Sequence, residues 1–326
     1  MAAPTELRFC WWNVQDFAHF DPSQAVIDRW PRTAAEYAEK FRRVVAAFDA
    51  MFGPSPPDII GLCEITRTAA EALRRARLPD HQLILTDAGD PFAFQVVLLI
   101  REKRGLQKRI EWIPEDVSAG TRPMAVARYF SQKAHILFVA CHWPAFEEST
   151  SREARRRCAD TLRGGIYDFL NPQTPAAILR HVVAFGDLNT EPHDDLFTDT
   201  LYASRDRDHA RRRRHHTDEP VRRVRLYNCG WRLVGESHSH GQAEPTERRV
   251  GTYYSASKHE WRTYDQVLVT GGLLTGKTPY LDEGELLIRT DAGNLIDNKP
   301  AKFRVESGVG YGLSDHYPLT GRILLA

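Results

Sequence analysis

Several features that would define another class of protein are missing from this sequence. No apolar run approaches the roughly 18 residues that a membrane-spanning helix needs. The first residues, Met1 to Arg8, contain no basic stretch followed by an apolar one, so they do not resemble a secretory signal. These absences predict a cytoplasmic protein that has no membrane partner.

Cysteine is scarce, and its count of five in 326 residues is odd. Cys10, Cys63 and Cys141 lie within apolar, strand-like runs, which favours reduced core thiols over a framework of disulfides. The chain also lacks internal repeats and Gly/Ser-rich linkers. We therefore expect a single domain over residues 1–326.

Charge of one sign is concentrated in one segment, although the whole chain has a net charge of only +1. Residues 205–225 hold nine arginines and four acidic residues, a net charge of +5. We expect this segment to be a basic surface insertion or a mobile loop. The histidines inside it, His215 and His216, add polarity and are not expected to bind metal.

Strand-like runs rich in Val, Ile, Phe and Trp recur along the chain, with helical patterns between some of them. A capping box at Thr33 and Glu36 predicts one helix, the same spacing at Thr150 and Glu153 predicts a second, and a short third is expected over 68–78. Several runs are continuously apolar, as strands buried on both faces are. The predicted strands are Leu7–Val14, Asp58–Ile65, Phe94–Arg101, Met124–Ser131, His135–Trp143, His181–Asn189 and Tyr264–Thr270.

Polar residues at or near the ends of these runs are the informative feature. Each one alone has an ordinary explanation, such as a turn or the point where a strand emerges into water. Together they are more numerous than chance would give, and functional groups of α/β sheets gather at one end of the strands. The residues are Asn13, Glu64, His142, Asp187, Asn189, Asp265, Asp315 and His316.

These residue types fit the hydrolysis of a phosphate ester. A hard cation such as Mg²⁺ takes oxygen ligands and needs only one or two carboxylates, which Glu64 and Asp315 can supply. Asp187 can orient or deprotonate the attacking water. A protonated His316 can stabilise charge on the phosphate, and Asp265 is the carboxylate expected to keep it protonated. Further donors to the phosphate are expected from His142, Asn189 and Asn13.

The sequence resembles the endonuclease/exonuclease/phosphatase superfamily, which includes DNase I, abasic-site endonucleases, sphingomyelinases and inositol polyphosphate phosphatases. The motifs WWNV, LCE, CHWP, FGDLN, YDQ and SDHYP occur in the expected order over nearly the whole chain, and FGDLN followed by SDH is the most specific pair. The stretches LYNCGW, GTYY and WRTYDQVLV are similar to nuclease-like bacterial members. Where some relatives have an aspartate two residues after the first asparagine, this chain has Gln15.

The resemblance implies an α/β fold of the DNase I type, a four-layer sandwich of two mixed β-sheets packed face to face with helices outside. It implies a Mg²⁺ (or Mn²⁺) site formed by Glu64 and Asp315, with Asn13 as a third ligand. It also implies that Asp187 activates water and that Asn189 holds the phosphate. His142 is similar to the histidine that DNase I-type members place on the phosphate, which separates this chain from abasic-site endonucleases.

The same chemistry serves several substrates, so the substrate is inferred from the surroundings. The basic segment favours nucleic acid, with Arg211, Arg212, Arg213 and Arg214 as contacts to the phosphate backbone, and Arg122 either contacts phosphate or occupies a surface turn. These features predict a metal-dependent phosphodiesterase, specifically an endonuclease that binds DNA. One alternative is a phosphatase or phosphodiesterase acting on an inositol phosphate or lipid headgroup. Another is an inactive binding protein, which the intact motifs disfavour.

Overall fold

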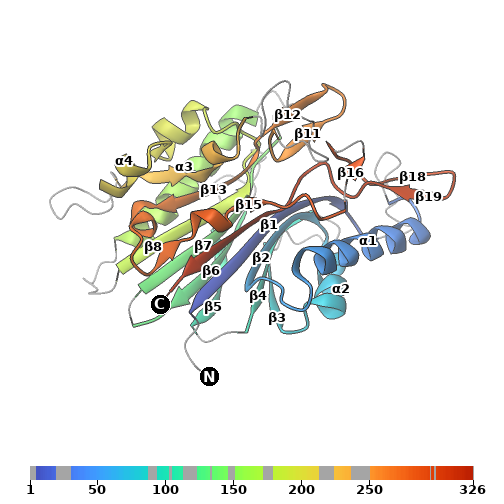
Figure 1. Ribbon diagram of the computed structural model, residues 1–326, viewed down its shortest axis with the longest axis horizontal. Helices are drawn as coiled ribbons and strands as arrows, with labels where there is room; N and C mark the ends of the chain where they lie inside the picture. The colour runs from blue at the N-terminus through green and yellow to red at the C-terminus, as the bar shows by residue number, and fades with distance from the viewer. Residues whose placement is uncertain are drawn as a thin grey trace.

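Two mixed β-sheets form the centre of the protein, as the computed structural model shows in Figure 1. The first sheet has the order β14–β20–β1–β2–β4–β3, and β15 also pairs with β20. The second has the order β5–β6–β7–β8–β13–β10–β9. The structure describes residues 5–19, 31–86, 94–102, 105–112, 123–132, 134–145, 151–171, 179–212, 224–235, 250–293, 295–296 and 299–325.

The first sheet is built from both ends of the chain. The N-terminal strand β1 runs parallel to β2, with Phe9 opposite Ile59, and antiparallel to the C-terminal strand β20, with Phe9 opposite Gly321. This pairing places the end of the sequence beside its beginning (Figure 1). The strands are β1 (Glu6–Phe17), β2 (Ile59–Ile65), β3 (His81–Leu85), β4 (Gln95–Arg101), β14 (Tyr280–Leu281), β15 (Leu287–Ile288) and β20 (Leu319–Leu324).

The second sheet is also mixed. Strands β7 and β8 are parallel over their whole length, and β13 runs antiparallel to β8 with Asp265 opposite Asp187. The start of β13 therefore meets the ends of β7 and β8. The strands are β5 (Leu106–Trp112), β6 (Met124–Phe130), β7 (Ala134–His142), β8 (Leu179–Asp187), β9 (Ala203–Ser204), β10 (Leu226–Asn228) and β13 (Asp265–Thr270).

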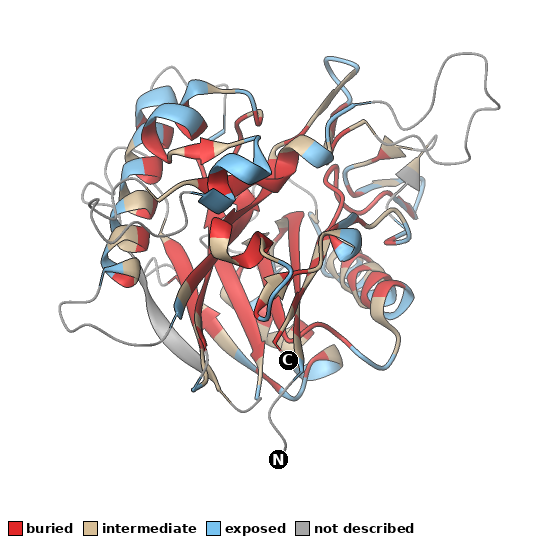
Figure 2. Ribbon diagram, turned by 60° about the vertical axis from the view of Figure 1, so that its left-hand side comes forward, coloured by how far each residue is buried: buried red, intermediate tan, exposed pale blue. Residues whose placement is uncertain are grey.

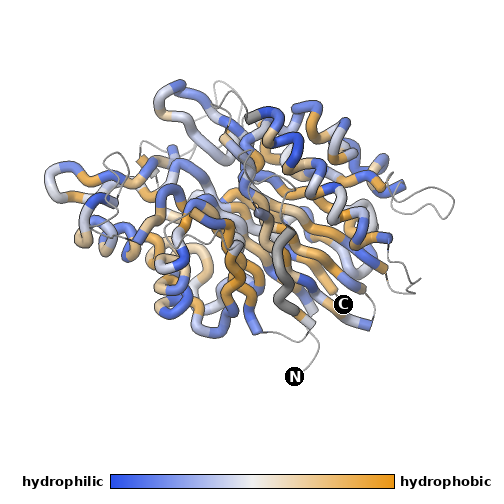
Figure 3. The backbone as a smooth tube through the Cα atoms, turned by 180° about the vertical axis from the view of Figure 1, so that it is seen from behind, coloured by the Kyte–Doolittle hydropathy of each residue, from blue (hydrophilic) through white to orange (hydrophobic). Residues whose placement is uncertain are grey.

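Successive side chains of each strand point to opposite faces of its sheet, and this alternation produces the layers. Phe9 and Trp11 of β1 point into the core between the sheets, where the Phe9 ring stacks on Phe185 at 5.6 Å. The alternate residues Cys10 and Trp12 pack under the helices instead. Figure 2 shows this buried interior, and Figure 3 shows that the strands crossing it are hydrophobic. The resulting order, helix–sheet–sheet–helix, confirms the predicted DNase I-like sandwich.

The helices cover the outer faces of the sheets. Helix α1 (Ala34–Phe52) and α2 (Arg67–Arg77) pack on the first sheet, whereas α3 (Ser151–Leu170) packs on the second. Thr33 caps α1 as expected, because its hydroxyl accepts a hydrogen bond from the Glu36 N–H at 3.2 Å. All five cysteines are free and buried, which agrees with the expectation of reduced core thiols. Among the described residues, no helix is both long enough and apolar enough to cross a membrane.

Part of the basic segment is a folded helix and not a mobile loop, whereas a surface insertion at 205–225 stays a prediction. Helix α4 (Arg207–Arg212) follows β9 and buries Ala210. Its backbone lies so close to Gly271 that a Cβ there would come within 2.0 Å of the Ala210 carbonyl oxygen. Residues 213–223 lie outside the described part of the chain.

Short hairpins, which the sequence did not predict, cover one end of the sheets. They are β11 (Tyr253–Ser255) with β12 (Glu260–Arg262), β16 (Leu295–Ile296) with β17 (Lys299–Pro300), and β18 (Arg304–Glu306) with β19 (Val309–Tyr311). Isolated bridges from Ala301 to Ser314 and from Lys302 to Leu313 fix the strand after β17 beside the segment that leads into β20. These hairpins form walls around the polar ends of the central strands (Figure 1).

Candidate active site

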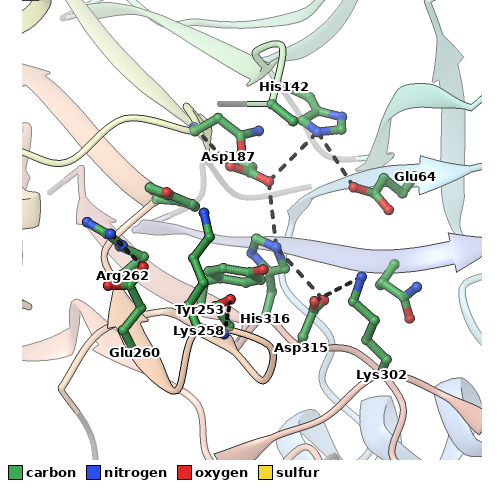
Figure 4. Close-up of a pocket in the computed structure, with 15 residues that line it drawn as sticks. Glu64, His142, Asp187, Tyr253, Lys258, Glu260, Arg262, Lys302, Asp315 and His316 are labelled. Atoms are coloured by element: carbon green, nitrogen blue, oxygen red, sulfur yellow. Dashed lines mark hydrogen bonds and ion pairs between the residues drawn. The ribbon is translucent and has the colours of Figure 1, made fainter. Parts of the chain in front are cut away.

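Six of the eight predicted polar residues line one cavity of about 240 Å³ at a common end of both sheets. The other two, Asn13 and Asp265, lie behind it and are hydrogen-bonded to Glu64 and His316, which line it. Parallel pairing brings the ends of β1 and β2 together in one sheet and those of β7 and β8 together in the other. Figure 4 shows Glu64, His142, Asp187, Asp315 and His316 facing one another across it. Glu64, His142 and Asp187 lie at the ends of the separate strands β2, β7 and β8, whereas Asp315 and His316 precede β20, and the topology brings them together.

Glu64 is held by two donors from the neighbouring strand β1. Its Oε1 accepts from the Asn13 Nδ2 at 3.0 Å, and its Oε2 accepts from the Asp16 backbone N–H at 3.2 Å. Burial alone would raise the pKa of Glu64, but the charges of His142 and His316 and these donors lower it to about 2. Glu64 is therefore a carboxylate at neutral pH, which a cation ligand must be.

The backbone of β1 and β2 is irregular where the two strands reach the cavity. The register of β1 against β2 shifts between Asn13 and Phe17, so the sheet contains a bulge here. Gln15, Asp16 and Glu64 have φ values of 44°, 48° and 55°, a left-handed region that side-chain-bearing residues rarely adopt. Such bulges redirect side chains next to active sites, and here the bulge turns Glu64 into the cavity.

Asn13 acts as a donor in this arrangement. Its Oδ1 accepts from the Gln15 backbone N–H at 2.9 Å, which identifies the opposite atom as the nitrogen. That Nδ2 donates to both Glu64 and Asp187 at 3.0 Å. Through Nδ2, Asn13 therefore positions two carboxylates, and the expectation that it also binds metal, through Oδ1, stays a prediction.

One oxygen of Asp315 accepts no hydrogen bond, although it lies 4.0 Å from the His316 Nε2. The residue is 4% exposed, and its Oδ1 is buried with no hydrogen-bond partner, while its Oδ2 lies 3.5 Å from the Lys302 Nζ. Burial raises the pKa of Asp315, which the charges of His316 and Lys302 oppose. A buried carboxylate oxygen without a donor is a costly arrangement that a bound cation would relieve.

The residues present fit a divalent metal ion. Glu64 and Asp315 line the same cavity and offer the carboxylate oxygens that hard cations prefer. Two other clusters have ligand atoms close enough together to hold a metal. One is Cys63 with His142 and Asp187, and the other is Asp187 with Asp265 and His316. The second group is already joined by a hydrogen bond, so Glu64 and Asp315 are the better candidates.

His316 and Asp265 form a buried ion pair. The His316 Nδ1 lies 2.8 Å from Asp265 Oδ2, and the Trp11 Nε1 donates to the other oxygen, Oδ1, at 2.8 Å. Burial would lower the pKa of His316, but the charges of Asp265 and Asp187 raise it to about 10. The imidazolium is therefore charged at neutral pH and directs its Nε2 towards Asp187, as Figure 4 shows.

Asp187 lies between the two histidines. Its Oδ2 is 3.7 Å from the His142 Nε2 and 3.8 Å from the His316 Nε2, and its Oδ1 accepts from the Asn189 N–H at 3.0 Å. Burial raises the pKa of Asp187 to about 7, against the opposing charge of His316. A carboxylate with this pKa can take a proton from water at neutral pH.

Asn189 reaches the cavity from the turn after β8. Its φ of 45° places it in the left-handed region, and its Nδ2 donates to the Trp143 carbonyl at 2.9 Å. This bond fixes the turn to the end of β7, beside His142. Both side chains line the cavity, where either can contact a phosphate oxygen.

Several residues of the site have no signal in the sequence. Lys258 and Lys302 line the cavity from the loops around β11 and β17, and Tyr253 lies against the His316 ring at 4.7 Å. Lys40 is a fully buried residue of α1 whose ammonium donates to the Gln15 carbonyl. Burial lowers the pKa of Lys40 to about 8, against the charges of Asp16, Glu64 and Asp315.

Two of the arginines expected to bind substrate, Arg211 and Arg212, do not line the cavity. Arg211 and Arg212 end α4, which packs beside Gly271 at the far end of β13 from Asp265. The six residues of β13 span roughly 20 Å at about 3.3 Å per residue. This separation counts against a contact with the phosphate held in the cavity. Arg122, Arg213 and Arg214 lie outside the described residues.

The two-sheet fold and its acid–histidine site define a class of phosphate-ester hydrolases. The sequence matches the Endonuclease/Exonuclease/phosphatase family over residues 14–222, more than half of the chain. The protein therefore belongs to this family, which confirms the resemblance seen in the motifs. The match ends before Asp265, Asp315 and His316, which only the structure joins to the rest of the site. No curated protein matches the sequence.

Solved structures share the fold at low sequence identity. A family member from Bacteroides thetaiotaomicron is 12% identical with a TM-score of 0.59, covering 99% of both chains. A mannosyl-6-phosphatase from the same organism is 12% identical with a TM-score of 0.57, covering 98% of this chain and 100% of that one. D. rerio TDP2, in complex with a single-strand DNA product, is 12% identical with a TM-score of 0.55. The match covers 98% of this chain and 99% of that one. These likenesses establish a common fold.

Proposed function

We propose that this protein is a Mg²⁺- or Mn²⁺-dependent phosphodiesterase that cleaves DNA. The observation that carries the hydrolytic part is the buried His316–Asp265 pair at 2.8 Å, which lies beside Asp187 in the same cavity as Glu64 and Asp315. A fixed cation, a carboxylate with a pKa of about 7 and two metal-binding carboxylates together suit attack by water on a phosphate ester.

Glu64 and Asp315 would hold the metal ion, and Asn13 would orient Glu64 towards it. When bound, the ion would act as a Lewis acid that polarises a phosphate oxygen. The orphaned Oδ1 of Asp315 and the low pKa of Glu64 both support this assignment.

Asp187 would orient the attacking water and accept its proton. His316, kept charged by Asp265, would donate a hydrogen bond from Nε2 to a phosphate oxygen as negative charge develops there. His142 and Asn189 would bind other oxygens of the same phosphate. Asp265 and Trp11 would act through His316, because they fix its orientation and charge.

DNA is the substrate favoured for two reasons. The cavity is bordered by Lys258 and Lys302, cations suited to a polyanion. A protein of the same fold, D. rerio TDP2, holds a single-strand DNA product. The competing candidate is a phosphatase of a small phosphate ester, which the cavity volume of about 240 Å³ favours and for which the mannosyl-6-phosphatase is a precedent in the fold.

One experiment tests the proposal. Purified protein is incubated with supercoiled plasmid and Mg²⁺ or Mn²⁺, alongside an EDTA control and an Asp187→Ala variant. We expect nicking by the wild type alone, abolished by EDTA. Phosphate release from inositol phosphates or mannose 6-phosphate, or cleavage of sphingomyelin, without cleavage of DNA or RNA would replace the nuclease by the competing candidate. No turnover of any of these substrates would point to a binding protein.

A further inference from the structure

A second and larger cavity, of about 750 Å³, adjoins the active site. We call it the distal cavity. It shares Tyr253, Ser255, Lys302 and Asp315 with the active-site cavity, so the two lie side by side. Its other walls come from the hairpin β11–β12 and from the segment 299–304 that follows β16. A phosphate monoester bound at the metal site would leave this volume empty.

The two cavities differ in charge. The active-site cavity is lined by four carboxylates against four cations, which are Lys258, Arg262, Lys302 and the protonated His316. The distal cavity has one carboxylate, Asp315, against three cations, Lys299, Lys302 and Arg304. The Arg304 guanidinium has an exposed ion pair with Glu306 at 2.9 Å, which water screens. The distal cavity therefore attracts an anion.

Backbone pairing holds these cations in place. The bridges Ala301–Ser314 and Lys302–Leu313 fasten their segment to the strand that carries Asp315. The Lys299 ammonium lies 4.4 Å from the centroid of the Tyr254 ring and 3.0 Å from its hydroxyl oxygen. Tyr254 itself is anchored by its N–H, which donates to the Asp315 carbonyl at 3.1 Å. Binding an anion here would need little reordering of the main chain.

We propose that the distal cavity binds a second phosphate of the substrate, the phosphodiester next to the one that is cleaved in a nucleic-acid strand. This inference rests on the proposed function and deepens it. Lys302 lines both cavities, so a strand with one phosphate at the metal site places its neighbour beside Lys302, Lys299 and Arg304. The distal cavity thereby selects a chain of phosphates over a single phosphate ester.

The test is a double variant, Lys299→Gln with Arg304→Gln, which leaves Lys302 and the metal ligands untouched. A matched control removes two cations from other parts of the surface, Arg75→Gln with Lys277→Gln. Both variants and the wild type are assayed on bis(p-nitrophenyl) phosphate, which has one phosphate, and on an oligothymidylate. Binding of fluorescent oligothymidylate is followed by anisotropy in EDTA over a range of salt concentrations.

We expect the distal variant to keep its kcat/KM on bis(p-nitrophenyl) phosphate within twofold. Its KM and its Kd for the oligonucleotide should each rise about tenfold, and the slope of log Kd against log salt should fall by about one. The control should match the wild type. Unchanged binding of the oligonucleotide, or an equal loss on both substrates, would overturn the inference.

The outcome also separates this inference from the proposed function. If the oligonucleotide binds through Lys299 and Arg304 but is not cut in the presence of Mg²⁺ or Mn²⁺, the nuclease assignment fails and the distal site stands. If it is cut equally well by both variants, the nuclease assignment stands and the distal site fails. The single variant Arg304→Gln, at an exposed position, repeats the test should the double variant not fold.

Discussion

Two basic regions of this molecule differ in what they can contact. The first, residues 205–225, is conspicuous in the sequence because nine arginines occur in 21 positions. The second, Lys299, Lys302 and Arg304, is inconspicuous in the sequence but lines a cavity beside the active-site cavity. A high density of charge along the chain is therefore a poor guide to where the charge lies in space.

The two ends of β13 explain the difference. Asp265 starts this strand and faces the active site, whereas Gly271 follows it and contacts α4. Two arginines of helix α4 are also paired with carboxylates. Arg211 lies 3.0 Å from Asp208, and Arg207 lies 2.8 Å from Glu283. We therefore expect large effects from changes at the Asp265 end and small ones from changes at the Gly271 end.

The largest effect is expected from Asp187→Asn. Without a carboxylate to take the proton from water, kcat should fall by roughly 10²–10⁴-fold on every phosphate ester that the protein cleaves. Steady-state kinetics with plasmid and with bis(p-nitrophenyl) phosphate measure the loss. Retention of more than a tenth of the activity would remove Asp187 from the role of base.

The same variant should be more stable than the wild type. A higher stability would show that its loss of activity does not come from unfolding. Burial raises the pKa of Asp187 to about 7 in the folded protein, above its value in the unfolded chain. Ionisation at pH 8 therefore costs folding free energy, and this cost disappears as pH falls and the carboxyl is protonated. We expect Asp187→Asn to raise the Tm of the metal-free protein at pH 8 by a few degrees, and by less at pH 5.

Asn13→Ala should weaken metal binding by about 10- to 100-fold, because Asn13 orients Glu64, one of the two carboxylates proposed to hold the metal. Titration of activity against Mg²⁺ gives the half-saturating concentration for each protein. At saturating Mg²⁺ most of the activity should return. A loss that metal cannot restore would show that Asn13 contacts the substrate as well.

Activity should depend on pH through two groups at the Asp265 end. Asp187 must be ionised to accept a proton, so the rate should fall about tenfold per unit as pH drops below about 7. His316 must be protonated, so the rate should fall as pH rises through about 10. A pH–rate profile of kcat/KM measures both limbs, and an alkaline limb near pH 6.5 would contradict the charged His316.

The smallest effect is expected from Arg211→Gln with Arg212→Gln on α4. These residues lie at the Gly271 end of β13, so KM for an oligonucleotide should change by less than about twofold. The distal-cavity variant, which also removes two cations, should change it about tenfold. If the two variants have equal effects, general surface charge and not position decides binding, and the contrast between the regions is lost.

Much of the fold was predictable because the strands are long, apolar runs with polar ends. The apolar runs located β1, β2, β7 and β8 to within three residues at each end, and the Thr33 cap located the start of α1. The hairpins around β11 and β16 were not predicted, because two- or three-residue strands have no periodicity to detect. Core residues from Leu7 to Leu325 share one cluster between the sheets, and we propose that the chain is a single domain on this ground.

The sequence by itself determined which residue types are available for chemistry and the order in which they follow apolar strands. Glu64, Asp187, Asp265, Asp315 and His316 are recognisable from their neighbours in the chain, because motifs are local. Only the tertiary structure decided that Asn13 donates to two carboxylates and that one oxygen of Asp315 accepts no hydrogen bond. It also decided that Lys299 and Arg304 border the site while Arg211 does not. Hydrogen-bond direction, burial and the end of a strand on which a charge lies depend on pairing between distant segments, which local sequence does not encode.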